Sequence, residues 1–328
     1  MKILFLTRPI LNGQLKLHDM ESLFAVLIVK IIPLYLNIAL GFIAAKTLDV
    51  HRDTIAKIMF FLINPLIVFN GVLSVHLSAS VLSLPLLTFC VSSGLSFLFY
   101  WLGGFLWKDS TRNLLAFSSG TGNTGYFGIP LAIILFPDEG ESDYILAILG
   151  MTLYENTFGY YWMSKGTSDS THWLVKLVRL PALYAFFSGL ILNALGMPIP
   201  TIFADFMIHI KGAFTVLGMM VIGLGLASFH QLKFDTVFIG LAFFAKFFIW
   251  PALMLLLIAI DKAFLHIYTD NIHGSLLLLS MVPLAVNMAI FASLLKAQPE
   301  KASTAIFLST LLALIYIPLM VTIFIGNV

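Results

Sequence analysis

The residues of this chain best suited to binding a small charged molecule lie near the middle of an apolar segment at 112–136. A helix that breaks there exposes N–H and C=O groups that lipid cannot satisfy, so the break must be buried in protein or line a wet cavity. Free N–H groups at the start of a half-helix attract anions, because the positive end of the helix dipole lies there. This stretch therefore predicts an anion site in which Thr121, Asn123 and Thr124 donate hydrogen bonds and Gly122 opens the backbone to the ligand.

A second polar interruption lies in the apolar segment at 273–295, where Pro283 and Asn287 occur. Proline removes a backbone donor and breaks or kinks a helix, and paired broken helices form the substrate site of many secondary transporters. We therefore expect one substrate site that includes Pro283 and Asn287, with Asn64 of the segment at 56–77 as a further contact. The alternative is that both interruptions are packing kinks, in which the amides only satisfy freed carbonyls.

Two ionisable residues, Glu155 and Lys246, are expected near the centre of apolar segments. Charged side chains at that depth are costly and mark functional sites by default. Glu155 could carry a coupling proton, and the alternative is a structural ion pair between Glu155 and Lys246. Nearer the surface, we expect Lys211 to extend its amine to the interface and the acidic stretch at 137–143 to be a solvated loop.

Composition indicates a polytopic membrane protein. The chain of 328 residues is 60% hydrophobic and 10% charged, with a mean hydropathy of +1.00, whereas soluble domains carry roughly 25% charged residues. The net charge of +2, without clustered basic residues, predicts no nucleic-acid partner. The histidines are not spaced as metal ligands and no catalytic or nucleotide-binding motif occurs, so neither an enzyme nor a metal or other cofactor is expected.

Ten apolar segments are long enough, at about 20 residues each, to cross the hydrocarbon core of a bilayer. They lie at 22–45, 56–77, 81–107, 112–136, 144–165, 181–197, 205–229, 235–260, 273–295 and 302–326. Ten spans divide into two sets of five, and an odd number of spans gives the two sets opposite orientations. The sets resemble each other, because Pro33 and Gly41 in the first span have the same spacing as Pro181 and Gly189 in the sixth. We therefore expect an all-α fold of two inverted five-helix repeats, with spans 4 and 9 broken.

The predicted domains are an N-terminal tail at 1–20, a first repeat at 21–165, a cytoplasmic linker at 166–180 and a second repeat at 181–326. Basic residues mark cytoplasmic loops, and they gather on one side of these spans. On that side lie Lys46, Arg52, Lys57, Lys108, Arg112, Lys165, Lys176, Arg179, Lys233, Lys296 and Lys301, whereas the outer loops between spans hold only Lys262. We therefore expect a multi-pass protein of the cell membrane with both termini outside. Met20, directly before the first span, is a candidate start residue.

The run GNTGYFGIPL at 122–131 resembles a signature of the auxin efflux carrier (PIN-like) transporter family, whose bacterial members include transporters of malate, malonate and similar organic acids. Asn64 with Pro65 and the residues at 283–287 support this resemblance by position. The resemblance implies the bile-acid-symporter-like fold, in which spans 1, 2, 6 and 7 form a scaffold and spans 3–5 and 8–10 form a moving transport domain. Helices 4 and 9 then cross at their breaks and offer polar groups to a substrate carboxylate.

Asn123 matches the asparagine of the motif that the auxin carriers place at this crossing. Gly122 departs from the family pattern, since the auxin carriers usually have proline there, and this departure implies a looser crossing.

The function expected from these features is secondary transport of small organic anions by elevator-type alternating access. The anions would be mono- or dicarboxylates such as malate, malonate or auxin-like acids. One alternative is a sodium-coupled symporter of bile-acid-like amphipathic anions, and another is a non-transporting membrane sensor. The expected partners are the organic anion and the lipid bilayer. The sequence is compatible with either H⁺ or Na⁺ as the coupling ion. It is also compatible with a homodimer.

Overall fold

The computed structural model describes residues 17–48, 50–136, 139–165, 180–197, 200–227 and 233–325. Every regular element in these ranges is a helix, and none of the described residues forms a β-strand. Six helices are long and apolar enough to cross a membrane, and the helix Pro181–Ala194 is apolar but shorter. The prediction of an all-helical, multi-pass membrane protein is therefore confirmed.

The helices of the first half follow the predicted apolar segments. In chain order they are α1 (Leu17–Thr47), α2 (Arg52–Ile58), η2 (Met59–Ile63), α3 (Asn64–Ser74), α4 (Ala79–Gly103), α5 (Thr111–Ser119), η3 (Thr124–Gly128), α6 (Ile129–Leu135), α7 (Glu139–Tyr154), η4 (Glu155–Gly159) and α8 (Tyr160–Ser164). The π-helical turn η2 joins α2 to α3 without a gap, and η4 joins α7 to α8 in the same way. Between α5 and η3, in contrast, the helix is interrupted.

The second half also consists of helices, some joined by π-helical turns and one pair separated by an interruption. Its helices are α10 (Pro181–Ala194), α11 (Thr201–Ala227), α12 (Thr236–Phe244), η5 (Ala245–Ile249), α13 (Trp250–Ile260), η6 (Asp261–Leu265), α14 (Asp270–Met281), α15 (Asn287–Leu294), α16 (Pro299–Met320) and η7 (Val321–Ile325). The run from α12 to η6 is continuous, whereas an interruption separates α14 from α15. The predicted linker at 166–180 lies outside the described residues except for Leu180.

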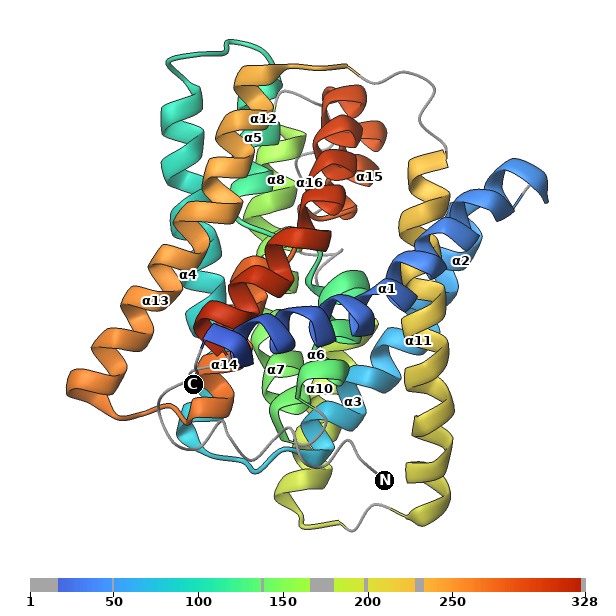
Figure 1. The fold of residues 1–328 in the computed structure, drawn as a ribbon, viewed down its shortest axis with the longest axis vertical. Coiled ribbons are helices and arrows are strands. Elements are labelled where there is room, and N and C mark those ends of the chain that lie inside the picture. Colours follow the sequence, from blue (N-terminus) through green and yellow to red (C-terminus); the bar gives the residue numbers. More distant parts are fainter. Residues whose placement is uncertain are drawn as a thin grey trace.

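The helices pack in two groups (Figure 1). In the first, α1 lies along α11 and α3 lies along α10; we call α1, α2, η2, α3, α10 and α11 the α1 group. In the second, α4 packs against α5 and α7, and α15 packs against α16; we call α4 to α8 with η3 and η4, and α12 to α16 with η5 to η7, the α4 group.

Glycine lets the helices of the α1 group approach closely. A Cβ atom added to Gly41 of α1 would overlap the carbonyl oxygen of Met220, and one added to Gly223 of α11 would overlap that of Ile38. On the other pair of helices, a Cβ atom on Gly189 of α10 would lie 3.0 Å from the carbonyl oxygen of Phe69. Small residues at such contacts let membrane helices gain packing energy from their backbones.

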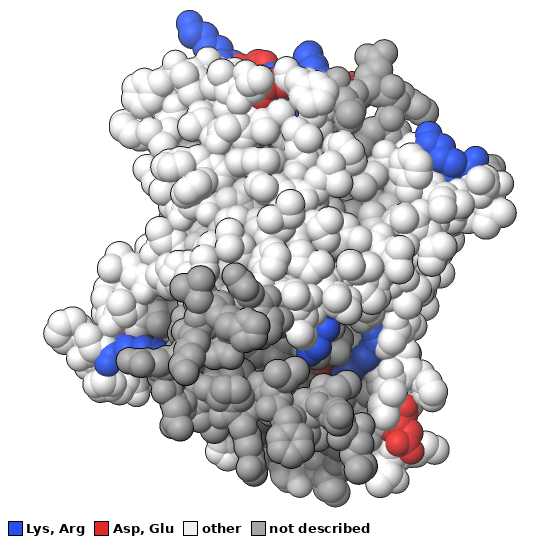
Figure 2. Space-filling model, viewed as in Figure 1, with Lys and Arg blue, Asp and Glu red and all other residues white. Residues whose placement is uncertain are grey.

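Charged side chains lie mainly toward the two ends of the molecule, and a broad uncharged zone separates them on the described part of the face in Figure 2. Glu141 differs from expectation, because its side chain is buried and accepts a hydrogen bond of 2.8 Å from Nζ of Lys211. The prediction of a solvated loop at 137–143 is therefore wrong for Glu141, Ser142 and Asp143, which are buried. The side chain of Lys211 stays 29% exposed while it binds Glu141. Helix α7 already begins at Glu139, so Glu141 belongs to a helix and its side chain contacts Lys211 of α11.

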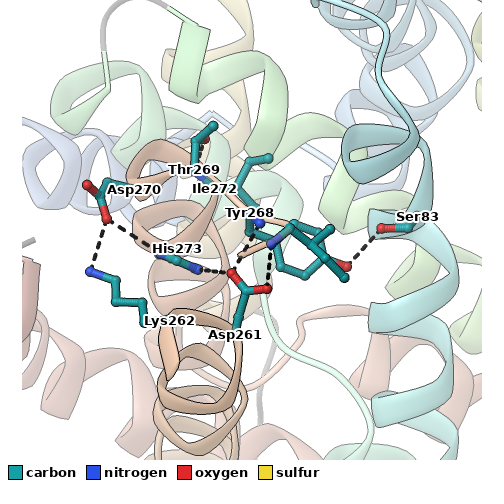
Figure 3. Close-up of polar contacts among 9 residues, drawn as sticks. Ser83, Asp261, Lys262, Tyr268, Thr269, Asp270, Ile272 and His273 are labelled. Carbon is teal, nitrogen blue, oxygen red and sulfur yellow. Dashed lines mark hydrogen bonds and ion pairs between the residues drawn. The ribbon is translucent and has the colours of Figure 1, made fainter. Parts of the chain in front are cut away.

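A polar cluster ties down the connection between η6 and α14 (Figure 3). The buried carboxylate of Asp261 accepts hydrogen bonds from the backbone N–H groups of Ile267 at 2.9 Å and Tyr268 at 3.1 Å. Its Oδ2 atom also lies 2.9 Å from Nε2 of His273 in α14. The hydroxyl of Tyr268 lies 2.8 Å from that of Ser83 in α4, so the connection is fastened to two helices of the α4 group.

Candidate functional site

A cavity of about 610 Å³ lies between the α1 group and the α4 group. One wall consists of residues from α2, η2, α3, α10 and α11, and the opposite wall of residues from 122–126, α7, η4 and 285–294. Both helix interruptions therefore reach the same cavity. Its position between the two groups makes it the candidate binding site.

The first interruption covers residues 120–123, where neighbouring atoms lie so close to Gly120 and Gly122 that neither position has room for a side chain. A Cβ atom on Gly122 would lie 2.5 Å from Nζ of Lys246 and 3.0 Å from Cγ2 of Val282. Asn123 has φ −75° and ψ 57°, and the Thr124 N–H group donates to the carbonyl of Gly122 at 2.7 Å. This is the geometry of an inverse γ-turn. The space around Gly122 is filled, so this interruption is closely packed rather than loose.

Aromatic donors satisfy the carbonyls that the interruption frees at the end of α5. The Tyr154 hydroxyl donates to the carbonyl of Ala116 at 3.0 Å, and the indole N–H of Trp250 donates to that of Ser119 at 2.7 Å. Both aromatic side chains are fully buried. Backbone groups exposed by a helix break inside a membrane need such partners, and here neighbouring helices supply them.

The second interruption covers residues 282–286 and contains Pro283. Val282, which precedes Pro283, is extended with φ −64° and ψ 152°, as expected for a residue before proline. The two interruptions touch, because the Asn123 N–H group donates to the carbonyl of Pro283 at 2.8 Å. The Leu284 N–H group finds a partner in the Ser309 hydroxyl at 3.1 Å.

Glu155, at the start of η4, joins both interruptions through its carboxylate. The Thr121 hydroxyl donates to Oε1, and the side-chain amide of Asn287 donates to Oε2 at 2.8 Å. Glu155 is buried and also lines the cavity. The same carboxylate therefore lines the cavity and accepts hydrogen bonds from a residue at each interruption.

Lys246 has different partners from Glu155. Its fully buried Nζ atom lies 3.4 Å from the carbonyl of Leu279 and 5.0 Å from the ring centroid of Trp250. Within the part of the chain that the structure describes, no ion pair joins Lys246 to Glu155. The alternative prediction of a structural ion pair between them is therefore wrong, because Thr121 and Asn287 occupy the carboxylate instead.

Asn123 lines the cavity and carries a buried side-chain donor that is unused. Its side chain is only 4% exposed, and its Nδ2 atom has no hydrogen-bond partner among the described residues. A buried donor without a partner costs about 1–3 kcal/mol, so a ligand that accepts this hydrogen bond recovers that free energy.

Comparisons with known proteins relate this chain to membrane transporters. Residues 167–321 match a protein family described as "Membrane transport protein". An uncharacterized transporter of Methanocaldococcus jannaschii is 27% identical over 285 residues, which are 82% of this chain and 88% of the relative. An uncharacterized transporter of Methanothermobacter thermautotrophicus is 26% identical over 197 residues, which are 60% of this chain and 63% of the relative.

Over residues 167–321 the chain is similar to this family of membrane transport proteins. The resemblance to the auxin efflux carrier family is thereby confirmed, and the expectation of a transporter rather than an enzyme agrees with the names of the relatives.

The structure brings most of the predicted site residues of this transporter to one cavity. Those that line it are Asn64, Gly122, Asn123, Thr124, Glu155 and Asn287. Thr121, Pro283 and Lys246 lie behind this wall, where they contact the residues that line it. Asn70 is buried elsewhere in α3 and does not line the cavity.

Sequence reasoning missed part of the transporter's site. Thr152 and Asn156 line the cavity one helical turn apart, and the Asn156 amide donates to the Thr152 carbonyl at 2.8 Å. Thr152 lies three residues before Glu155, and this spacing was an available signal, since residues three or four apart share a helix face. Asn156 directly follows Glu155 and gave no such signal. The apolar lining, which includes Phe60, Phe214 and Phe291, carried no signal, because phenylalanine is frequent throughout this chain.

Proposed function

We propose that this transporter carries small organic anions by secondary transport and binds the substrate carboxylate at Asn123. The observation that carries the proposal is the buried Nδ2 atom of Asn123, a donor without a partner in the wall of a cavity. Two helix interruptions meet at this residue through its backbone N–H group. Unpaired donors at such a meeting point favour a negatively charged ligand.

The remaining lining favours a substrate with an apolar body and one carboxylate. Aromatic and aliphatic side chains from both walls, among them Phe60, Val68, Phe214 and Phe291, face the same space. Such surfaces gain free energy from covering apolar groups, at roughly 25 cal/mol per Å². Lys57 is exposed and also lines the cavity. Its amine would bind the second carboxylate of a dicarboxylate.

The packing of the α1 group supports two inverted five-helix repeats. If the halves are related, span 1 corresponds to span 6 and span 2 to span 7. The observed pairs are α1 with α11 and α3 with α10, so span 1 packs on span 7 as span 2 packs on span 6. Exchanging the halves turns one pair into the other, which is the relation that an inverted repeat requires.

The position of the cavity supports an elevator-type mechanism. The site residues of the α4 group face α2, η2, α3, α10 and α11 across the cavity. A displacement of the α4 group along the α1 group would carry Asn123 and its ligand from one side of the membrane to the other. The α1 group would then act as the fixed scaffold.

Glu155 is the residue proposed to couple transport to protons. An anion bound near Asn123 would be repelled by an ionised Glu155 that lines the same cavity, because like charges in a site of low dielectric constant interact strongly. Proton uptake by Glu155 removes this repulsion, so substrate and proton would bind together. Proton coupling is preferred to sodium coupling because Glu155 is a buried acid within the cavity wall.

The test is uptake of labelled carboxylates by proteoliposomes, with and without proton and sodium gradients. We expect Asn123→Ala to weaken substrate binding about ten- to hundredfold, because a hydrogen bond to a charged group contributes about 1.5–3 kcal/mol. Asn37→Ala is the matched control, since Asn37 lies half-buried in α1 and does not line the cavity. Unchanged substrate affinity in a folded, monodisperse Asn123→Ala protein would contradict the proposed site.

A further inference from the structure

A second hollow, of about 440 Å³, lies at the end of the molecule where α4 ends, α5 begins and α8 ends. It is separate from the cavity between the two groups, and the two share no lining residue. The hollow includes three cationic side chains, Lys108, Arg112 and Lys165, and one carboxylate, Asp109. None of the ion pairs among the described residues involves these three cations.

The carboxylate of Asp109 is already occupied by other donors. Its Oδ1 atom accepts a hydrogen bond of 3.0 Å from the Thr111 N–H group, and its Oδ2 atom accepts one of 3.2 Å from the side-chain amide of Gln298. Asp109 therefore does not neutralise the cations by direct pairing. The hollow keeps an excess of positive charge.

The aromatic ring of Tyr100 holds two of these cations in place. The guanidinium carbon of Arg112 lies 3.7 Å from the ring centroid, and Nζ of Lys165 lies 4.6 Å from it. Arg112 Nε donates to the carbonyl of Tyr100 at 2.8 Å, and Lys165 Nζ donates to its hydroxyl at 2.6 Å. Trp162 stacks on the same ring at 4.1 Å between centroids, so the ring itself is fixed. The two cations are thus positioned before any ligand binds.

The surface beside the hollow is strongly apolar. Trp101 is 59% exposed, Phe105 is 71% exposed and Leu106 is 54% exposed, and all three lie on the last turns of α4 or just after it. In a membrane protein such a surface faces acyl chains, and exposed tryptophan is typical of the membrane interface. A ligand that combines a phosphate with acyl chains therefore matches both parts of this region.

We propose that this hollow binds the headgroup phosphate of an anionic phospholipid, with Arg112 and Lys165 as its main ligands and Lys108 adding charge at the rim. Basic pockets between membrane helices recognise anionic headgroups in this way, and arginine pairs with phosphate oxygens through its planar fork of donors. The acyl chains would cover the exposed side chains at 101–106. The bound lipid would join the ends of α4, α5 and α8.

The experiment uses the purified full-length protein, stripped of lipid in detergent, and native mass spectrometry to measure lipid retention. The probes are phosphatidylglycerol, phosphatidylcholine with the same acyl chains, and inorganic phosphate. We expect phosphatidylglycerol to be retained at least about tenfold better than phosphatidylcholine, because each basic residue near a headgroup favours anionic lipid. Arg112→Gln combined with Lys165→Gln should weaken retention of phosphatidylglycerol on the order of tenfold.

Lys46→Gln is the matched control, because Lys46 is exposed in the last turn of α1 and lies outside the hollow. Equal retention of the two lipids, or unchanged retention in the double variant, would overturn the proposal. Binding of inorganic phosphate as strong as that of phosphatidylglycerol would instead identify a soluble-anion site and would also overturn it. If that double variant does not fold, Lys108→Gln combined with Lys165→Gln is measured in its place. Retention of phosphatidylglycerol equal to that of the wild type would then overturn the proposal.

Discussion

Glu155 receives hydrogen bonds from both helix interruptions, although they belong to segments far apart in the sequence. Thr121 and Asn287 each donate to one of its two oxygens. The two donors come from different interruptions, so this one side chain contacts both. Any change in its charge therefore acts on the two interruptions at once, which suits a group that couples an ion to movement.

We predict that Glu155→Gln leaves the protein folded but removes the proton dependence of transport. Glutamine keeps the size of the side chain and an oxygen that accepts a hydrogen bond, but it cannot gain or lose a proton at physiological pH. Uptake into proteoliposomes under an imposed pH gradient measures the effect. Glu300→Gln is the control, since Glu300 is exposed in the first turn of α16. Uptake that still responds fully to the gradient would assign Glu155 a structural role only.

At the scale of elements, the sequence was sufficient to predict an all-helical protein that crosses a membrane. Apolar length predicts the spans, and the glycines and Asn123 before a new helical run predict the first interruption. The partners of the interruption were not predictable, because Tyr154 and Trp250 come from other helices and look like ordinary apolar positions in the sequence. The same reason explains the missed burial of Glu141, whose partner Lys211 lies 70 residues further along the chain.

The close approach of α1 and α11 gives a prediction about stability. We expect Gly223→Ala to destabilise the protein by about 1–3 kcal/mol, the range typical of overpacked positions, because the added methyl group overlaps the Ile38 backbone. Gly212→Ala on the same helix should have little effect or stabilise slightly, since no atom lies within 4 Å of a Cβ atom there. Thermal unfolding in detergent compares the two variants. Equal melting temperatures would show that the helices can separate at no cost.

At the scale of the whole molecule, the cavity between the two groups of helices is the feature that the proposed transport cycle depends on. Its two walls come from different groups, so a relative movement of the groups changes which side of the membrane the cavity opens to. The polar cluster around Asp261 fastens the connection before α14 to α4. The ends of α4, η6 and α14 are therefore expected to move together as one unit of the α4 group.

The orientation of the molecule gives a further prediction. In a chain whose single, exposed cysteine is replaced by Cys90→Ser, we expect a cysteine at Asn271 to react with an impermeant thiol reagent on intact cells. A cysteine at Lys108 should react only after the cells are opened. Both positions are exposed and lie at opposite ends of the helices, and the distribution of basic residues places Lys108 inside. Labelling of Lys108 but not Asn271 on intact cells would reverse the orientation.

The hydrogen bond between the Asn123 N–H group and the Pro283 carbonyl also bears on how the protein is made. The donor belongs to the first half of the chain and the acceptor to the second, so 160 residues separate them. While the ribosome has produced only the first half, the donor of Asn123 has no such partner inside the membrane, where water cannot replace it. The first half is therefore expected to stay incomplete until the ninth span has been inserted, and a chain that stops early would expose this defect to membrane quality control.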